Sequence, residues 1–141
     1  HSATGLGDNF AVIGNADITR VYMAQDGAAV IYADGTINTS DKNFKDNIIP
    51  SNLGSNFISK LKPVSFNFKK NKKKRYGFIA QDIKETLLDI GIEEEVLITY
   101  DKESDKYGLN YSDIICPLVK AFQEQSSKLD ALEKRILALE K

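Results

Sequence analysis

A heptad repeat at the C-terminal end of the chain limits what this sequence can fold into more than any other feature. Its residues, apolar except for Gln125, recur at alternating intervals of three and four: Ile115, Phe122, Leu129 and Ile136 at position a, and Leu118, Gln125, Leu132 and Leu139 at position d. Such a stripe predicts a long helix that packs in a coiled coil. The alternative is an amphipathic helix packed on its own domain, whose stripe would drift from a strict heptad.

Charged residues beside this seam indicate how the helices pair. Lys128 and Arg135 fall at position g, and Glu133 and Glu140 fall at position e five residues later. This pairing favours identical, parallel helices in register. Leucine at position d is compatible with both dimers and trimers, so the heptads alone leave the number of chains open.

The first 39 residues have a different composition, rich in Gly, Ala, Asn and Thr. Asp26-Gly27 and Asp34-Gly35 separate short β-prone runs, and Asp-Gly is a turn signal between strands. These strands are short and contain few bulky apolar residues, so one chain could hardly bury a core with them. We therefore interpret residues 1–39 as the end of a β-structured stalk built by several chains, which favours three chains in the coiled coil.

Residues 41–111 are denser in charged, aromatic and aliphatic side chains and predict a globular α+β unit. The expected elements are a short helix at residues 55–61 capped by Ser55, a strand at 62–68, a turn at 69–75, a second strand leading into a helix that Gly91 ends, and a hairpin at 95–111. Ser112 is expected to cap the long final helix, about residues 112–141, with Pro117 just inside it.

Histidine and cysteine are nearly absent: the sequence has His1, to which we give no weight, and Cys116, expected to be a buried or interface thiol. Disulfides, cysteine–histidine metal sites and Ser-His or Cys-His catalytic pairs are therefore not expected. Lys and Arg number 19 against 20 Asp and Glu, which does not favour nucleic acid as the obligatory partner. No apolar run approaches the roughly 18 residues that span a bilayer, so no membrane partner is expected.

Three motifs resemble the C-terminal intramolecular chaperone and autoprotease domain of phage tailspikes and tail fibres, first recognised in endosialidases. "SDKNFKDNI", from Ser40, is similar to the opening Ser-Asp block of that family, with a lysine five residues after the serine. "YGFIAQDI" is similar to its Gly-x-x-Ala-Gln block, and "LNYSDIICPLVKAFQEQ" to its Leu-x-Tyr block before the terminal helix. The chain departs from the family at residues 42–44 and at Asp82, where the family often has Arg or Leu and Glu respectively.

This resemblance implies a function as well as a fold. It implies that residues 40–141 trimerise and fold the upstream stalk, and then release themselves by cutting the Thr39–Ser40 bond with a catalytic pair of Ser40 and Lys45. It also implies assembly in the host cytoplasm, with the stalk ending in the virion tail and the chaperone portion released. The expected partners are two further copies of the chain and the stalk of the same polypeptide; no cofactor is required.

The chemistry of such a pair sets conditions on the fold. A serine hydroxyl needs a base, and a lysine, whose free pKa is ~10.4, must be partly desolvated or placed near other positive charge to act as one. Ser40 and Lys45 would lie about 140° apart on a helix and on opposite faces of a strand, so a turn must separate them, or the lysine must come from a neighbouring chain. Gln81 is an expected oxyanion donor, and Asp41 is expected to orient either the loop or the Lys45 ammonium.

Other interpretations of these residues remain open. Ser40 can be read as a helix N-cap, with Asp41 in the first turn, which would make the domain a trimerisation cap that never cleaves. A cluster of positive charge in the predicted turn is most simply a solvated loop; an ATP or phosphate site and a nucleic-acid surface are the further alternatives. The cluster consists of Lys69, Lys70, Lys72, Lys73, Lys74 and Arg75.

Overall fold

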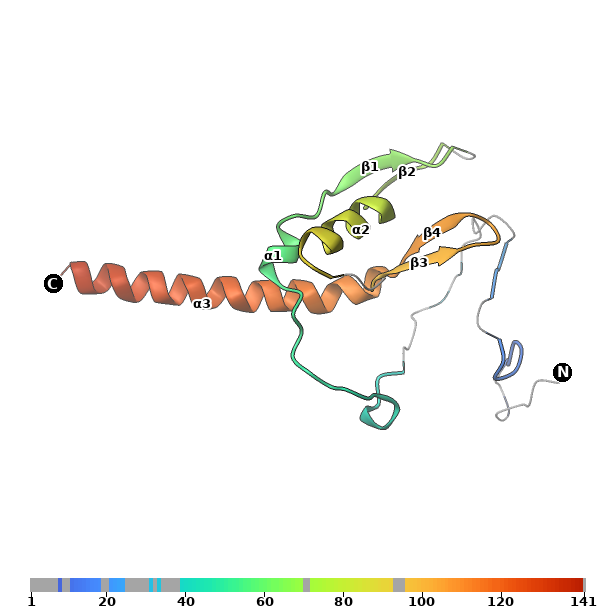
Figure 1. The fold of residues 1–141 in the computed structure, drawn as a ribbon, viewed down its shortest axis with the longest axis horizontal. Helices are drawn as coiled ribbons and strands as arrows, with labels where there is room; N and C mark the ends of the chain where they lie inside the picture. Colours follow the sequence, from blue (N-terminus) through green and yellow to red (C-terminus); the bar gives the residue numbers. More distant parts are fainter. Residues whose placement is uncertain are drawn as a thin grey trace. The chain divides into compact units, whose positions relative to one another are not determined.

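The computed structural model describes residues 8, 11–18, 21–24, 31, 33, 39–69, 72–92 and 96–140. The chain divides into two units, residues 1–46 and residues 47–141. The second unit is a mixed α/β fold with two small antiparallel sheets and a long C-terminal helix, which confirms the predicted α+β class (Figure 1). In chain order the elements are η1 (Lys42–Phe44), α1 (Ser55–Ile58), β1 (Val64–Asn67), β2 (Lys74–Gly77), α2 (Ala80–Asp89), β3 (Ile98–Asp101), β4 (Lys106–Leu109), η2 (Tyr111–Ile114) and α3 (Ile115–Leu139).

The described residues before Ser40 form no strand. The two Asp-Gly turns that motivated the stalk interpretation, at residues 26–27 and 34–35, lie outside the described residues. A stalk that several chains build together has its hydrogen-bond partners on other chains. The stalk therefore stays a prediction.

Both predicted hairpins are present. Strands β1 and β2 pair antiparallel, with Val64 opposite Gly77, and β3 pairs with β4 in the same way. Along β1 the side chains alternate between half-buried and exposed, as the period-two pattern predicts. The predicted turn at residues 69–75 is too long, because Lys74 and Arg75 extend the ladder opposite Asn67 and Phe66.

Helix α2 (Ala80–Asp89) follows the second strand as expected, and its end is as predicted. Gly91 follows the helix with φ of +80°, a conformation that glycine adopts without strain. The amide of Gly91 donates to the carbonyl of Leu88, and the amide of Ile92 donates to the carbonyl of Leu87. These two bonds satisfy carbonyls that the helix would otherwise leave unpaired.

Helices α1 and α2, strand β3 and the turn η2 all contribute to one apolar core. Phe57 is fully buried, which explains why a helix as short as α1 is held in place. Partly buried residues, among them Leu61 and Phe78, pack around the core. The buried members of the cluster are Leu53, Phe57, Ile83, Leu87, Ile98 and Ile114.

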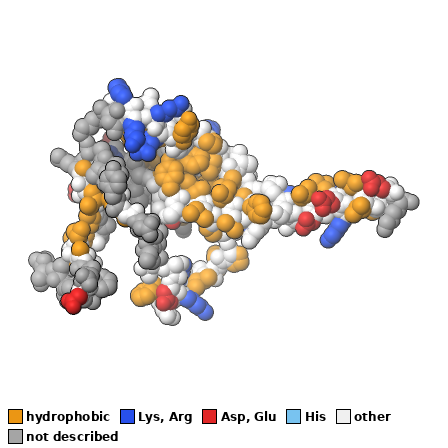
Figure 2. All heavy atoms as spheres, turned by 180° about the vertical axis from the view of Figure 1, so that it is seen from behind, with side chains coloured by type: hydrophobic (Ala, Val, Ile, Leu, Met, Phe, Trp, Pro, Cys, Tyr) orange, Lys and Arg blue, Asp and Glu red, His pale blue; other side chains and the backbone are white. Residues whose placement is uncertain are grey.

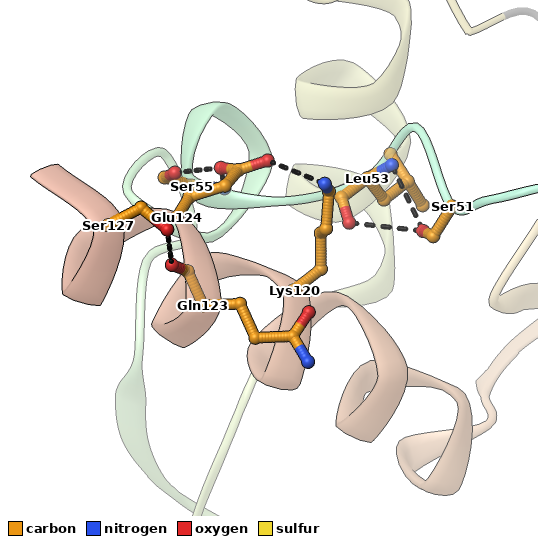
Figure 3. Close-up of polar contacts among 7 residues, drawn as sticks. All are labelled: Ser51, Leu53, Ser55, Lys120, Gln123, Glu124 and Ser127. Carbon is orange, nitrogen blue, oxygen red and sulfur yellow. Dashed lines mark hydrogen bonds and ion pairs between the residues drawn. The ribbon is translucent and has the colours of Figure 1, made fainter.

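The predicted cap of α1 is wrong, because Gly54 occupies the N-cap position and Ser55 is the first helical residue. The capping group comes instead from α3: Glu124 accepts hydrogen bonds from the backbone amide of Ser55, at 2.9 Å, and from its hydroxyl (Figure 3). Lys120 Nζ lies 3.6 Å from the other carboxylate oxygen. A Cβ at position 54 would lie 2.6 Å from that carboxylate, so a side chain there would displace the end of Glu124 from its contact with Ser55.

The predicted cap of the long helix is also wrong. Ser112 lies inside the 3₁₀ turn η2, where its hydroxyl donates a bond of 2.7 Å to Asn110 Oδ1, and α3 begins only at Ile115. Pro117 is the third residue of α3, where its missing N–H breaks no intrahelical bond. Cys116 is exposed in the single chain, so the expected burial does not occur within it.

Helix α3 presents two faces. Pro117, Ala121 and Glu124 face its own unit, so the helix packs on its own domain through residues outside the heptad seam. The heptad seam lies roughly a quarter-turn away, at about 100° per residue, and its apolar side chains are exposed along the helix. They continue towards the C-terminal end (Figure 2). The exposed seam residues are Ile115, Leu118, Phe122, Leu129, Leu132, Ile136 and Leu139.

Adjacent leucines on α2 provide a matched test of the core. Leu87 is 2% exposed and Leu88 is 51% exposed. We expect Leu87→Ala to lower the free energy of unfolding by about 2–5 kcal/mol, because it leaves a cavity beside Phe57 and Ile83. Leu88→Ala should change it by about 0.5 kcal/mol or less. Urea unfolding followed by circular dichroism at one protein concentration measures both, and equal losses in the two variants would contradict this core.

The contact between Glu124 and Ser55 predicts a pH-dependent stability. Hydrogen bonds from the hydroxyl and then the amide of Ser55, with a smaller contribution from Lys120, lower the pKa of Glu124 below its ordinary value of 4.5. A lowered carboxyl pKa stabilises the folded state fully above the unfolded pKa, and this stabilisation is lost as the pH falls through the folded pKa. The wild type should therefore be more stable than Glu124→Gln at pH 7, with a difference that shrinks below about pH 4.5.

Thermal unfolding of both chains at several pH values measures this difference. Glu85→Gln removes an exposed carboxylate from α2 and controls for the loss of one negative charge. A difference between wild type and Glu124→Gln that stays constant from pH 7 to pH 3 would show that the contact does not couple proton binding to folding.

Candidate active site

Ser40 and Lys45 are in direct contact within one chain. The Nζ atom of Lys45 donates a hydrogen bond of 2.8 Å to the Oγ atom of Ser40. Both residues belong to the first unit. A serine hydroxyl and an amine at this distance have the geometry that a nucleophile and its general base require.

A short 3₁₀ turn brings the two side chains together. Its backbone bonds run from the amide of Phe44 to the carbonyl of Asp41 and from the amide of Lys45 to the carbonyl of Lys42, each 3.1 Å long. The chain returns to extended geometry at Lys45, with φ of −126° and ψ of 135°. The spacing of five residues, which neither a regular helix nor a strand could accommodate, is thus satisfied by a turn.

Asp41 occupies the N-cap position of this turn. Its Oδ1 atom accepts a hydrogen bond of 2.8 Å from the amide of Asn43. The alternative in which Ser40 caps a helix is therefore wrong: the cap is the next residue, and the Ser40 hydroxyl is bonded to Lys45 instead.

The loop that carries this pair is exposed throughout residues 39–50 in the single chain. The hydrogen bond as it stands runs from the lysine to the serine, so Lys45 is the donor. A lysine takes a serine proton only when its amine is neutral, which desolvation or nearby positive charge favours. The single chain therefore holds the two groups in place but does not supply the surroundings that catalysis needs.

Gln81, the expected oxyanion donor, lies in the first turn of α2 and its side chain is exposed. It belongs to the second unit, whereas Ser40 and Lys45 belong to the first. Its role as a donor to the reacting carbonyl stays a prediction.

The basic cluster lies at the end of the first hairpin and in the start of β2, where Lys and Arg side chains gather at the surface (Figure 2). Lys72 has φ of 55°, as turn residues often do, and Lys74 Nζ lies 5.5 Å from the centre of the Tyr76 ring. Lys70 lies outside the described residues. The phosphate, ATP and nucleic-acid interpretations of this cluster stay predictions.

Two of the sequence motifs meet in space, which the sequence reasoning did not anticipate. The amide of Phe78 donates a hydrogen bond of 3.1 Å to the hydroxyl oxygen of Tyr111, and the two rings lie 6.2 Å apart. A Cβ at Gly77 would collide with that hydroxyl, so the glycine of one motif makes room for the tyrosine of the other. In the sequence, this contact is indicated only by the presence of Gly77 in one short motif and Tyr111 in another.

Two further findings concern the parts of the chain that the structure describes. No helix there is both long and apolar enough to cross a bilayer. Nor do three or more His, Cys, Asp or Glu side chains gather there in an arrangement that could hold a metal ion.

The described geometry defines a small mixed α/β domain on a long helix, preceded in the sequence by a turn that holds a serine–lysine pair. Residues 40–97 match the sequence model of a family described as the chaperone of endosialidase, which confirms the resemblance over these residues. The match begins at Ser40, and the motif that leads into α3 lies beyond its end. It indicates a chaperone role, and the name of the family indicates a peptidase. No curated protein matches the chain significantly.

Proposed function

We propose that this chain is an intramolecular chaperone that trimerises through α3, folds the β-stalk upstream of it, and releases itself by cutting the Thr39–Ser40 bond. The observation that supports this most directly is the 2.8 Å hydrogen bond between Lys45 and Ser40, at the residue where the family match begins. The substrate is the backbone of the same chain, and cleavage happens once per chain. Assembly takes place in the host cytoplasm, and the freed stalk becomes part of the virion tail.

The proposed reaction balances with one water molecule and no cofactor. The Ser40 hydroxyl oxygen bonds to the carbonyl carbon of Thr39 while its proton passes to neutral Lys45. The C–N bond then breaks, the proton passes from Lys45 to the Ser40 nitrogen, and an ester joins Thr39 to the Ser40 side chain. Water deprotonated by Lys45 hydrolyses this ester, leaving a carboxylate on Thr39 and a new N-terminus at Ser40. Backbone amides or Gln81 hold the oxyanion in both steps.

Assembly is the step that activates this site. The turn already holds Ser40 against Lys45 in one chain, while the whole loop remains exposed to water. Packing of three chains around the stalk would remove that water and lower the cost of a neutral lysine. Cleavage would then follow correct assembly, and the cut stalk would lose its assisted route to unfolding and refolding, which traps it kinetically.

The exposed seam of α3 supports the trimer. Its apolar side chains, Leu129 and Leu132 among them, are more than half exposed in the single chain. Burying these side chains between parallel helices contributes a favourable free energy of association. The single chain, in which they are exposed, lacks this contribution. Three linked chains at high local concentration then start the intertwined stalk at a lower entropic cost.

Removal of either member of the pair should stop cleavage. In wild type, mass spectrometry should find a fragment of residues 1–39 and one that begins at Ser40, with a rate that rises with pH because the base must be neutral. Ser40→Ala and Lys45→Ala should each slow cleavage by about 10³-fold or more and leave oligomerisation intact. Lys62→Ala, which removes an exposed lysine outside the loop, should be cut at the wild-type rate.

Cleavage of Ser40→Ala at the wild-type rate would show that its hydroxyl is not the nucleophile. A wild-type chain that forms trimers with its stalk and still remains whole would leave the non-cleaving trimerisation cap as the function.

A charge in the heptad seam should dissociate the trimer. Leu132 occupies position d, and Ala131 beside it occupies position c, outside the seam. We expect Leu132→Lys to give monomers at micromolar concentration, since a buried ammonium in the seam is costly, while Ala131→Lys stays trimeric. Light scattering after size-exclusion chromatography measures the mass of each. Trimers in both variants would contradict assembly through this seam.

A further inference from the structure

Asp41 makes a contact that bears directly on the proposed cleavage. The inference drawn from this contact rests on the proposed function. Its carboxylate accepts from the amide of Asn43, and its carbonyl accepts from the amide of Phe44. Both bonds close the turn that separates Ser40 from Lys45. We infer that Asp41 is a positioning residue for cleavage, which acts by capping the turn and not by attracting the Lys45 ammonium.

In the single chain local bonds must hold this turn, because packing does not, so the geometry of the pair is set by these bonds before the chains assemble. The turn η1 contains no buried residue, and Phe44, its largest apolar side chain, is 79% exposed. An exposed turn of three residues has little stability of its own, since ordering its backbone costs conformational entropy. The cap of Asp41 therefore sets how often Lys45 lies against Ser40.

A capping role and an electrostatic role depend on different properties of the Asp41 carboxylate. A cap needs an oxygen one carbon beyond Cβ, which Asp, Asn and Ser can approximate, and it needs no charge. An electrostatic role needs the charge and tolerates a longer side chain. Asn keeps the cap and loses the charge, whereas Glu keeps the charge and moves its oxygens one methylene further from the Asn43 amide.

The test is the cleavage rate of assembled trimers carrying Asn, Glu or Ala at position 41, measured by mass spectrometry. Asp41→Ala and Asp41→Glu should each be about fivefold slower or more, because the turn forms less often without its cap. Asp41→Asn should restore the rate to within about twofold of wild type. Asp46→Ala, which removes the carboxylate next to Lys45 without touching the cap, should also stay within about twofold.

Each outcome separates this inference from the proposed function. Fast cleavage by Asp41→Glu with slow cleavage by Asp41→Asn would assign Asp41 an electrostatic role and overturn the cap. Wild-type rates in Asp41→Ala would overturn any positioning role while leaving the Ser40–Lys45 pair intact. Absence of cleavage in wild type would instead count against the proposed function. Trimer mass and melting temperature should be equal across the series, which distinguishes positioning from a general loss of fold.

Discussion

Among the described residues, a core of six buried apolar side chains is the constraint on which the second unit depends. Phe57, Ile83 and Leu87 are its most buried members, and they connect α1 to α2. The net stability of a domain is a small difference between large terms, so burial of further apolar surface can change it strongly. The apolar seam that is exposed on α3 is one source of such burial. In the proposed trimer, association and folding would therefore be coupled.

The candidate site differs from the buried core, because in the single chain only local hydrogen bonds hold it. Six consecutive residues, 40–45, contain the proposed nucleophile, the cap, the turn and the proposed base, and none of them is buried in the single chain. From the sequence, the lysine could come from the same chain, across a turn, or from a neighbouring chain. In the structure one chain makes the contact by itself. In the proposed function, assembly has to provide only the exclusion of water and the groups that stabilise the oxyanion.

Local patterns predicted the elements well where one side of the chain meets the core. The alternation in β1, the hairpin of β3 and β4 and the stop at Gly91 follow from periodicity and from the conformational freedom of glycine. The two predicted N-caps were wrong for different reasons. Glu124, distant in the sequence, replaced the expected cap of α1, whereas the Ser112 hydroxyl bonds locally to Asn110 inside η2. The turn between Ser40 and Lys45 was predicted from their spacing in the sequence. For Asp41 the sequence left two roles open, orienting the loop or orienting the Lys45 ammonium. The packing of the seam and of the stalk could not be worked out from one chain, because in the proposed trimer their partners belong to other chains.

Glu124 connects the fold of one chain with the proposed assembly of several chains. It lies on the helix that carries the heptad seam, yet its carboxylate holds the first residue of α1. The own-unit face of α3 and its seam are about a quarter-turn apart, so in the proposed trimer the same turns of helix would contact both their own core and two further chains. A helix that lost its contact with Ser55 would still present its seam, but α1 would no longer be held beside it by that contact. The carboxylate at position 124 would therefore couple the fold of one chain to the proposed assembly of three.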